Sequence, residues 1–153
     1  MAEAILTDRG LIAIAGADAT EFLHNLVTND IRSLSRGQAR FAALLTPQGK
    51  IISDFFVFRE QGTAGDRLLL DCPLSQTAEL LRRFERYRLR SKVDFADINV
   101  DHEVVAYLDG PSPEESVVAA APDPRAPEMG WRAIVRKGVA DARGDRAIYE
   151  ERR

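Results

Sequence analysis

Asp54 is the residue of this sequence best placed to do chemistry. It lies between the apolar residues Ile51, Ile52, Phe55 and Phe56. A carboxylate among that much hydrocarbon costs free energy unless it is paired. Asp54 is therefore expected either on the exposed side of a half-buried strand or as a placed ligand for a polar group of a substrate.

A second acid, Asp71, ends another apolar segment and is followed by Cys72 and Pro73. Asp71 could bond an amide of a ligand, or it could cap the helix that is expected to start at Pro73. The cap is favoured, because aspartate is a preferred N-cap residue and contributes about 1 kcal/mol there. Cys72 is expected to be a small buried residue, although a helix N-terminus lowers a thiol pKa and could make it reactive.

The remaining residues give no catalytic or metal-binding pattern. His24 and His102 stand far apart, and no cysteine or further histidine lies at metal-ligand spacing. The serines lack the nucleophile-elbow motif, and no glycine-rich phosphate loop is present. We therefore predict no catalytic residue and no structural metal.

The segment 82–92 is strongly basic, with five arginines and one lysine against one glutamate. Such a segment could attract an RNA backbone or a polyglutamyl tail. The plainer interpretation, which we favour, is a solvated helix face whose aliphatic stems cover the edge of the core.

Apolar periodicity indicates the elements that must position these residues. Thr46-Pro47-Gln48-Gly49 separates two apolar runs and predicts a hairpin. A capping-box pattern formed by Asp18 and Glu21 predicts a helix start. Expected strands are 11–16, 39–45, 50–59, 67–71 and 93–98, and expected helices are 18–27 and 73–89.

A second unit is expected to begin near residue 100, which divides the chain into 1–99 and 100–153. Its expected elements are strands at 104–108, 117–120 and 131–135 and a short helix at 146–153. That last helix shows no stop signal, so we expect it to be poorly anchored. A turn is expected at Thr28-Asn29-Asp30.

Four motifs in a fixed order carry a family resemblance. They are G-x-D-A-x-x-F-L at 16–23, T-N-D-I at 28–31, L-T-P-Q-G-K-I at 45–51 and Y-x-L-R-S-K-V at 87–93. This order resembles the folate-binding YgfZ family, whose members are relatives of the glycine-cleavage T-protein, an aminomethyltransferase. Residues 131–137 extend the resemblance more weakly, and the family's K-G-C-Y-x-G-Q-E motif is absent.

The resemblance implies an α+β fold: a folate-binding domain of the T-protein type, with mixed sheets, packed helices and an incomplete second unit. It implies that Asp54 lies close to the pterin of a folate, where one carboxylate can accept two N–H bonds. Asp71 corresponds to the neighbourhood of an N-A pair and is the second expected cofactor-binding residue. Ser53 replaces another acid of the T-protein pattern, which argues against T-protein chemistry.

Three functions are compatible with the resemblance. The first is a folate-binding accessory protein for iron–sulfur cluster assembly or repair, linked in this family to tRNA modification. The second is a tetrahydrofolate-dependent aminomethyltransferase, and the third is a non-catalytic scaffold fragment. We favour the first, with a weak or partial tetrahydrofolate site, no enzymatic activity, and folate and iron–sulfur client proteins as partners.

Composition sets the remaining expectations. The 153 residues carry a net charge of −3, which argues against a general grip on nucleic acid, and the single cysteine allows no intrachain disulfide. No apolar stretch approaches the roughly 20 residues that span a bilayer. The first residues lack the pattern of a signal peptide. We therefore expect a cytoplasmic protein without a membrane partner.

Overall fold

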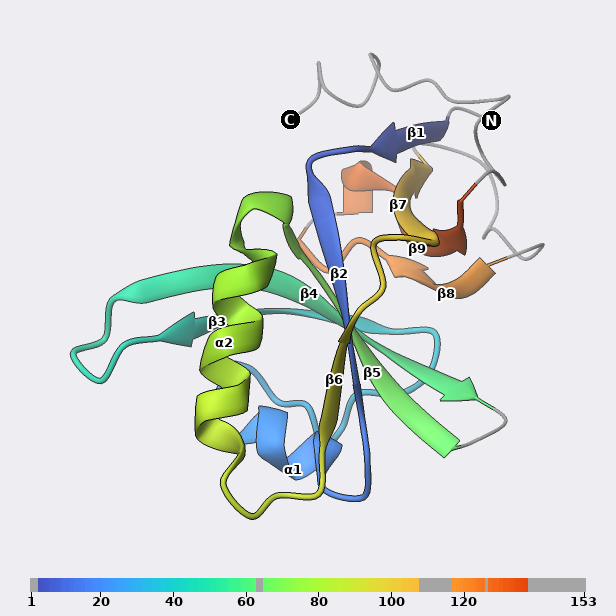
Figure 1. Ribbon diagram of the computed structural model, residues 1–153. Coiled ribbons are helices and arrows are strands. Elements are labelled where there is room, and N and C mark those ends of the chain that lie inside the picture. Colours follow the sequence, from blue (N-terminus) through green and yellow to red (C-terminus); the bar gives the residue numbers. More distant parts are fainter. Residues whose placement is uncertain (1–2, 63–64, 108–116, 126, 138–153) are drawn as a thin grey trace.

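The computed structural model describes residues 3–62, 65–107, 117–125 and 127–137, which form two β-sheets and two α-helices (Figure 1). The strands are β1 Glu3–Leu6, β2 Arg9–Ala15, β3 Ala39–Leu45, β4 Ile51–Gly62, β5 Gly65–Pro73, β6 Asp94–Asp97, β7 His102–Tyr107, β8 Val117–Pro122 and β9 Trp131–Arg136. The helices are α1 Ala19–His24 and α2 Thr77–Arg88, with 3₁₀ turns at Leu74–Gln76 and Pro127–Met129.

The larger sheet has the order β3-β4-β5-β2-β6, and its pairs are antiparallel. Both helices cover one face of this sheet. Phe22 of α1 and Phe84 of α2 pack there with Phe55 and Val57 of β4. The apolar residues that recur at helical spacing in the two helices thus form the first core, as the sequence predicts.

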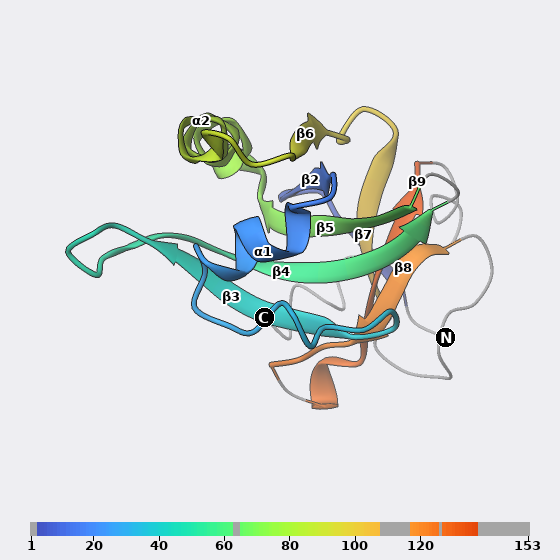
Figure 2. The same ribbon diagram turned by 90° about the horizontal axis from the view of Figure 1, so that it is seen from below.

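The opposite face of the larger sheet packs on the smaller sheet, whose order is β1-β7-β9-β8. In Figure 2 the strands β7, β8 and β9 cross β4 and β5 at a steep angle. Phe56 and Phe58 of β4 pack there with Val104 and Ile134 of the smaller sheet. Since successive side chains of a strand point to opposite faces, the continuous apolar run of β4 is explained by burial on both sides.

The α+β fold predicted from the sequence is confirmed. The strands after residue 100 correspond to β7, β8 and β9, and the predicted helix at 73–89 starts as a 3₁₀ turn that continues into α2. The predicted helix at 146–153 lies outside the described residues.

One strand was not predicted. Residues Glu3 to Leu6 form β1, which pairs antiparallel with β7 in the smaller sheet. The start of the described chain is thereby joined to strands that follow residue 100. The division into units 1–99 and 100–153 stays a prediction.

The start of α1 corrects another expectation. Asp18 occupies the N-cap position of α1, but its side chain makes no capping bond. Instead it accepts a hydrogen bond from the backbone N–H of Lys92 at 2.8 Å. Glu21 pairs with Arg32 at 2.6 Å, so the predicted capping box does not form.

Candidate functional site

The hairpin that carries Asp54 forms as predicted. The N–H of Gly49 donates to the carbonyl of Thr46 at 2.9 Å, and Gly49 has a φ of 89°, which suits glycine. Leu44 is paired with Ser53 and Leu45 with Ile51, so one extra residue of β4 forms a bulge.

This bulge fixes the register in which Asp54 lies directly opposite Ala43 of β3. Ser53 is buried at 3% exposure, whereas Asp54 is exposed. Asp54 shares its face of the sheet with Phe56, because alternate residues of a strand point the same way. Among the described residues, no side-chain hydrogen bond or ion pair involves Asp54. Its carboxylate is therefore available to a ligand.

Phe41 is a candidate residue that sequence reasoning missed. It is 36% exposed and is paired with Phe56, their ring centroids being 5.0 Å apart. Since Ala43 is opposite Asp54, Phe41 lies diagonally across from Asp54 on the same face, within reach of an aromatic side chain. The sequence signal is that alternate residues of the segment 39–45 lie on the same face of a strand. This signal places Phe41 near Asp54 only once the bulged register of β3 and β4 is known.

The T-N-D-I motif holds β3 at this place. Thr28 accepts a hydrogen bond through Oγ1 from the N–H of Ala43 at 3.0 Å. Asn29 donates through Nδ2 to the carbonyl of Phe41 at 3.1 Å, and Asp30 caps the following turn by accepting from Ser33. The predicted turn is confirmed, and it tethers the two β3 residues nearest to Asp54.

The predicted capping role of Asp71 is wrong. Asp71 is fully buried, and its two carboxylate oxygens accept from Arg9 Nε at 2.7 Å and from Arg132 Nε at 2.5 Å. The 3₁₀ turn begins after Pro73 without any side-chain cap. A buried carboxylate is tolerable when it is paired in this way. Asp71 therefore links the larger sheet to β9, and its role in binding a ligand stays a prediction.

Phe56 is surrounded by cations from both sheets. The guanidinium carbons of Arg132, Arg125 and Arg9 lie 4.1, 4.8 and 5.8 Å from the centroid of its ring, within the range of cation–π attraction. Arg125 also pairs with the buried carboxylate of Asp123 at 2.8 Å. The group of Asp71, Asp123 and these three arginines, called here the arginine cluster, holds three positive charges against two negative ones.

Cys72 follows Asp71 and is buried as predicted. Burial raises the pKa of its thiol to about 11, and the hydrogen bond with Thr77 opposes this shift only in part. A thiol with such a pKa is almost entirely protonated at neutral pH, so the nucleophilic thiolate is scarce.

Asp54 lines neither of two cavities that are formed by described residues. One of about 480 Å³ lies beside Gly16, Thr20, Arg59 and Arg67, and one of about 260 Å³ includes Arg9 and His102. The position of Asp54 in a cleft stays a prediction.

The described ranges contain neither a metal-binding cluster nor a membrane-spanning helix. No three residues among their histidines, cysteines and acids are grouped so that they could hold a metal ion. None of their helices has the length and hydropathy needed to cross a bilayer.

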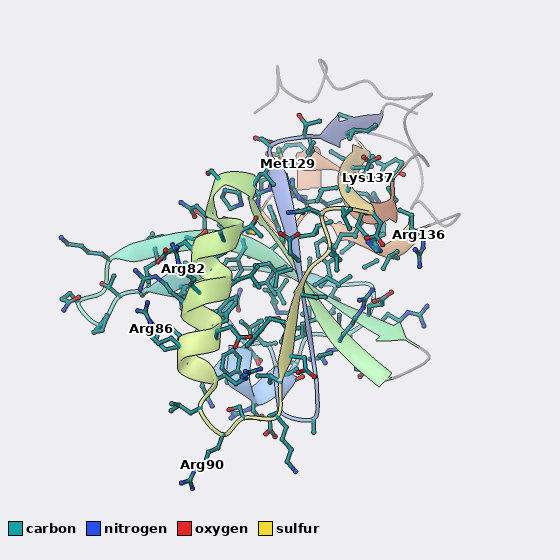
Figure 3. The ribbon with its side chains drawn as sticks, viewed as in Figure 1. Arg82, Arg86, Arg90, Met129, Arg136 and Lys137 are labelled. Carbon is teal, nitrogen blue, oxygen red and sulfur yellow. The ribbon has the colours of Figure 1, made fainter. Side chains whose placement is uncertain are left out.

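The basic segment forms much of α2 and the turn after it. Arg83 pairs with Glu79 at 2.7 Å, and Arg88 with Glu85 at 3.0 Å. Arg82 also pairs with Glu79, and hydrogen bonds from Arg82 and Arg83 hold the pKa of Glu79 below its usual value. Arg82, Arg86 and Arg90 are exposed, and Figure 3 shows Arg82 and Arg86 on the side of α2 and Arg90 beyond its C-terminal end. This confirms a solvated helix face.

The exposed carboxylate and ring together define the candidate site. A planar heteroaromatic molecule could stack on Phe41 while its N–H groups donate to Asp54. The arginine cluster lies next to them around Phe56, and its arginines pair with Asp71 or Asp123. This arrangement is suited to binding, because it offers an exposed aromatic ring beside a charged hydrogen-bond acceptor.

Relatives among curated proteins carry one common name. The chain is 29% identical over 138 residues to "Iron-sulfur cluster assembly factor IBA57 homolog, mitochondrial" of Mycosarcoma maydis, covering 83% of this chain and 34% of that protein. It is 31% identical over 169 residues to the protein of the same name from Aspergillus fumigatus, covering 90% of this chain and 38% of that protein. The chain thus spans little more than a third of the length of these relatives.

The fold also matches a solved structure. The crystal structure of glycine cleavage system aminomethyltransferase T from Bartonella henselae matches with a TM-score of 0.71 at 17% sequence identity. The match covers 99% of this chain and 46% of that chain. At this identity the likeness concerns the fold alone.

A family model agrees with these likenesses. The model described as "GCVT N-terminal domain" matches residues 6–143, which is most of the sequence and includes every described strand except the first residues of β1. The chain belongs to the family of the GCVT N-terminal domain.

Proposed function

We propose that this chain serves iron–sulfur cluster assembly or repair and binds a reduced folate on the face that carries Asp54 and Phe41. The observation that carries the binding part is the unpaired, exposed carboxylate of Asp54 placed diagonally from an exposed aromatic ring. The assembly part is supported by the curated relatives, which are named iron–sulfur cluster assembly factors.

The chemistry of a pterin suits this face. A pterin is flat and presents an amino group beside a ring N–H, and one carboxylate can accept both bonds with charge assistance. Stacking on Phe41 would add apolar contact. We propose tetrahydrofolate as the ligand and weak binding, because an open face makes fewer contacts and is less preorganised than an enclosed pocket.

An aminomethyltransferase remains the alternative, and the residue next to Asp54 disfavours it. Ser53, which replaces the second acid of the T-protein pattern, is buried and makes only a long hydrogen bond of 3.4 Å to the carbonyl of Asp54. Asp54 therefore has no second carboxylate beside it on the strand to share proton transfer. The third function, a non-catalytic scaffold fragment, differs from the proposed one in that it predicts no folate binding.

The finer parts of the proposal follow the resemblance of the sequence motifs. We propose a YgfZ-type protein with iron–sulfur clients and a link to tRNA modification. We also propose a cytoplasmic location, although the names of the curated relatives place those proteins in mitochondria.

Isothermal titration calorimetry with tetrahydrofolate tests the binding. We expect weak binding by the wild type, and a loss of about 1–3 kcal/mol for Asp54→Asn because ligand donors lose their charged acceptor. Phe41→Ala should also weaken binding. Asp94→Asn is the matched control, since Asp94 is an exposed acid on the far edge strand β6. Equal, tight binding by Asp54→Asn and the wild type would remove Asp54 from the site.

A cellular experiment tests the assembly role. In a strain that lacks its own family member, expression of this chain should raise the activity of an iron–sulfur enzyme, and Asp54→Asn should reduce that effect. Aminomethyl transfer by the purified chain would instead establish the enzymatic alternative.

A further inference from the structure

The turn after α2 holds a leucine in a backbone conformation that leucine rarely adopts. Leu89 has a φ of 47° and a ψ of −112°, and it is the one described residue other than glycine with positive φ. The N–H of Ser91 donates to the carbonyl of Arg88 at 2.8 Å, which closes a four-residue turn around Leu89. These angles resemble the first central position of a type II′ turn, where glycine is normal.

The side chain of Leu89 gains nothing from the rest of the described fold. It is 88% exposed, the highest value among the exposed large apolar residues. Glycine would relieve the backbone strain and give up almost no packing. A strained and exposed leucine is therefore costly for the isolated domain, which is typical of a residue that makes its contacts with a partner.

The surroundings of Leu89 are cationic. Arg86 lies one turn earlier on α2, and Arg90 follows Leu89; both are exposed, and neither has an ion pair among the described residues. Lys92 adds a third exposed cation. Figure 3 shows Arg86 projecting from the side of α2 and Arg90 lying beyond the C-terminal end of that helix. The Leu89 corner, meaning Arg86, Leu89, Arg90 and Lys92, thus combines one apolar projection with three cations that have no side-chain ion pair among the described residues.

We propose that the Leu89 corner is a docking surface for a protein partner that presents carboxylates around a small apolar depression. Charge complementarity selects an acidic partner, and an apolar depression would bury the leucine. This inference stands on the geometry of the turn and does not depend on folate binding or on iron–sulfur chemistry.

Other polyanions fit the corner less well. RNA phosphates would use the arginines and leave Leu89 without a function. A membrane would receive a single leucine, whereas stable attachment takes more apolar area than one side chain supplies. Both give distinguishable outcomes in the experiment.

The test uses the whole 153-residue chain and an array of short acidic peptides, each carrying one or two apolar residues. We expect a subset to bind, and fluorescence anisotropy with the best peptide should show weakening on Leu89→Gly by about tenfold or more, since burial of a leucine contributes that much. The same substitution should raise Tm, because glycine suits the turn. Higher Tm with weaker binding excludes unfolding as the cause.

Matched variants separate the components. Arg86→Gln and Arg90→Gln should weaken peptide binding and should make the affinity less dependent on salt concentration. Arg36→Gln should change neither, because Arg36 is an exposed arginine elsewhere on the chain. Val100→Ser is the apolar control, since Val100 is 83% exposed in a different turn.

Four outcomes would overturn the proposal. The first two are that no peptide binds, and that Leu89→Gly binds the peptide as tightly as the wild type does. The third is that oligouridylate binds more tightly than any peptide and that Leu89→Gly does not change its affinity. The fourth is that phosphatidylglycerol vesicles bind in a Leu89-dependent manner while no peptide binds.

Discussion

The carboxylate of Asp18 and the backbone N–H of Lys92, 74 residues apart in sequence, are joined by a hydrogen bond of 2.8 Å. The N–H of Asp18 donates in return to the carbonyl of Lys92 at 3.1 Å. The G-x-D motif and the R-S-K-V motif are therefore hydrogen-bonded to each other. This contact anchors the end of the Leu89 corner, at Lys92.

Loss of the Asp18 carboxylate should destabilise the domain. We expect Asp18→Ala to lower the free energy of unfolding by about 1–3 kcal/mol, because a backbone N–H loses a charged acceptor. Asp18→Asn keeps an acceptor oxygen and should cost less. Urea denaturation measures both variants, and equal stability of Asp18→Ala and the wild type would show that the bond contributes nothing.

Gly16 should tolerate no side chain. Its φ is 119°, and a Cβ built on it would lie 2.3 Å from the carbonyl oxygen of Lys92. Gly16→Ala must displace backbone, so we expect a loss of about 2–4 kcal/mol. Gly49→Ala is the control, because Gly49 also has positive φ but nothing lies within 4 Å of its built Cβ. A larger loss for Gly49→Ala than for Gly16→Ala in the same denaturation assay would contradict the steric argument.

Removal of the Asp71 carboxylate should be the most damaging of the polar substitutions. Asp71→Ala leaves Arg9 and Arg132 without their shared acceptor in the interior, at a cost of about 3–5 kcal/mol. The double variant Asp71→Ala with Arg132→Met should lose less stability than the sum of the losses of the two single variants. Thermal unfolding followed by circular dichroism would decide, and strictly additive losses would show that the two side chains are not coupled.

The thiol of Cys72 should react slowly. With its pKa raised to about 11 by burial, the thiol should resist Ellman's reagent at pH 8 in the folded state. Full labelling should follow unfolding in urea. Rapid labelling of the native chain would show that Cys72 is reached without unfolding.

Asp101 should contribute to the loss of folding stability at acidic pH. The hydrogen bond with His102 Nδ1, at 2.6 Å, lowers the pKa of the Asp101 carboxyl below its ordinary 3.8. A group whose folded-state pKa is depressed stabilises the fold above its unfolded pKa, and this contribution is lost as pH falls through the folded value. Wild type should therefore exceed Asp101→Asn in stability at pH 6 and converge with it well below pH 3.8. A constant difference across urea melts at both pH values would exclude this linkage.

The elements with strong apolar periodicity were predictable from the sequence, and the long-range partners of polar groups were not. The 45–51 turn follows from the chemistry of Pro47 and Gly49. Asp18 and Asp71 were both assigned to helix caps by a local rule. In the structure the carboxylate of Asp18 instead accepts from a backbone N–H 74 residues away, and the carboxylate of Asp71 accepts from an arginine 61 residues away.

Strand β1 and the neighbourhood of the candidate site also escaped prediction, for physical reasons. Strand β1 has four residues, too short for a periodic signal, and its partner β7 is distant in sequence. The neighbourhood of Phe41 and Asp54 depends on a bulge that shifts the pairing of β3 and β4. A register is a property of two strands together, so neither segment alone reveals it.

The pairing of β1 with β7 has a consequence for synthesis on the ribosome. The strands β2 to β6 and both helices are complete once residue 97 has emerged, so the larger sheet can form early. β1 must wait for β7 and remains unpaired in the nascent chain until β7 has emerged. Domains fold as their segments become available. The pairing of β1 with β7 therefore follows the formation of the larger sheet, and a fusion or a bound chaperone at residues 3–6 would delay that pairing while leaving the larger sheet intact.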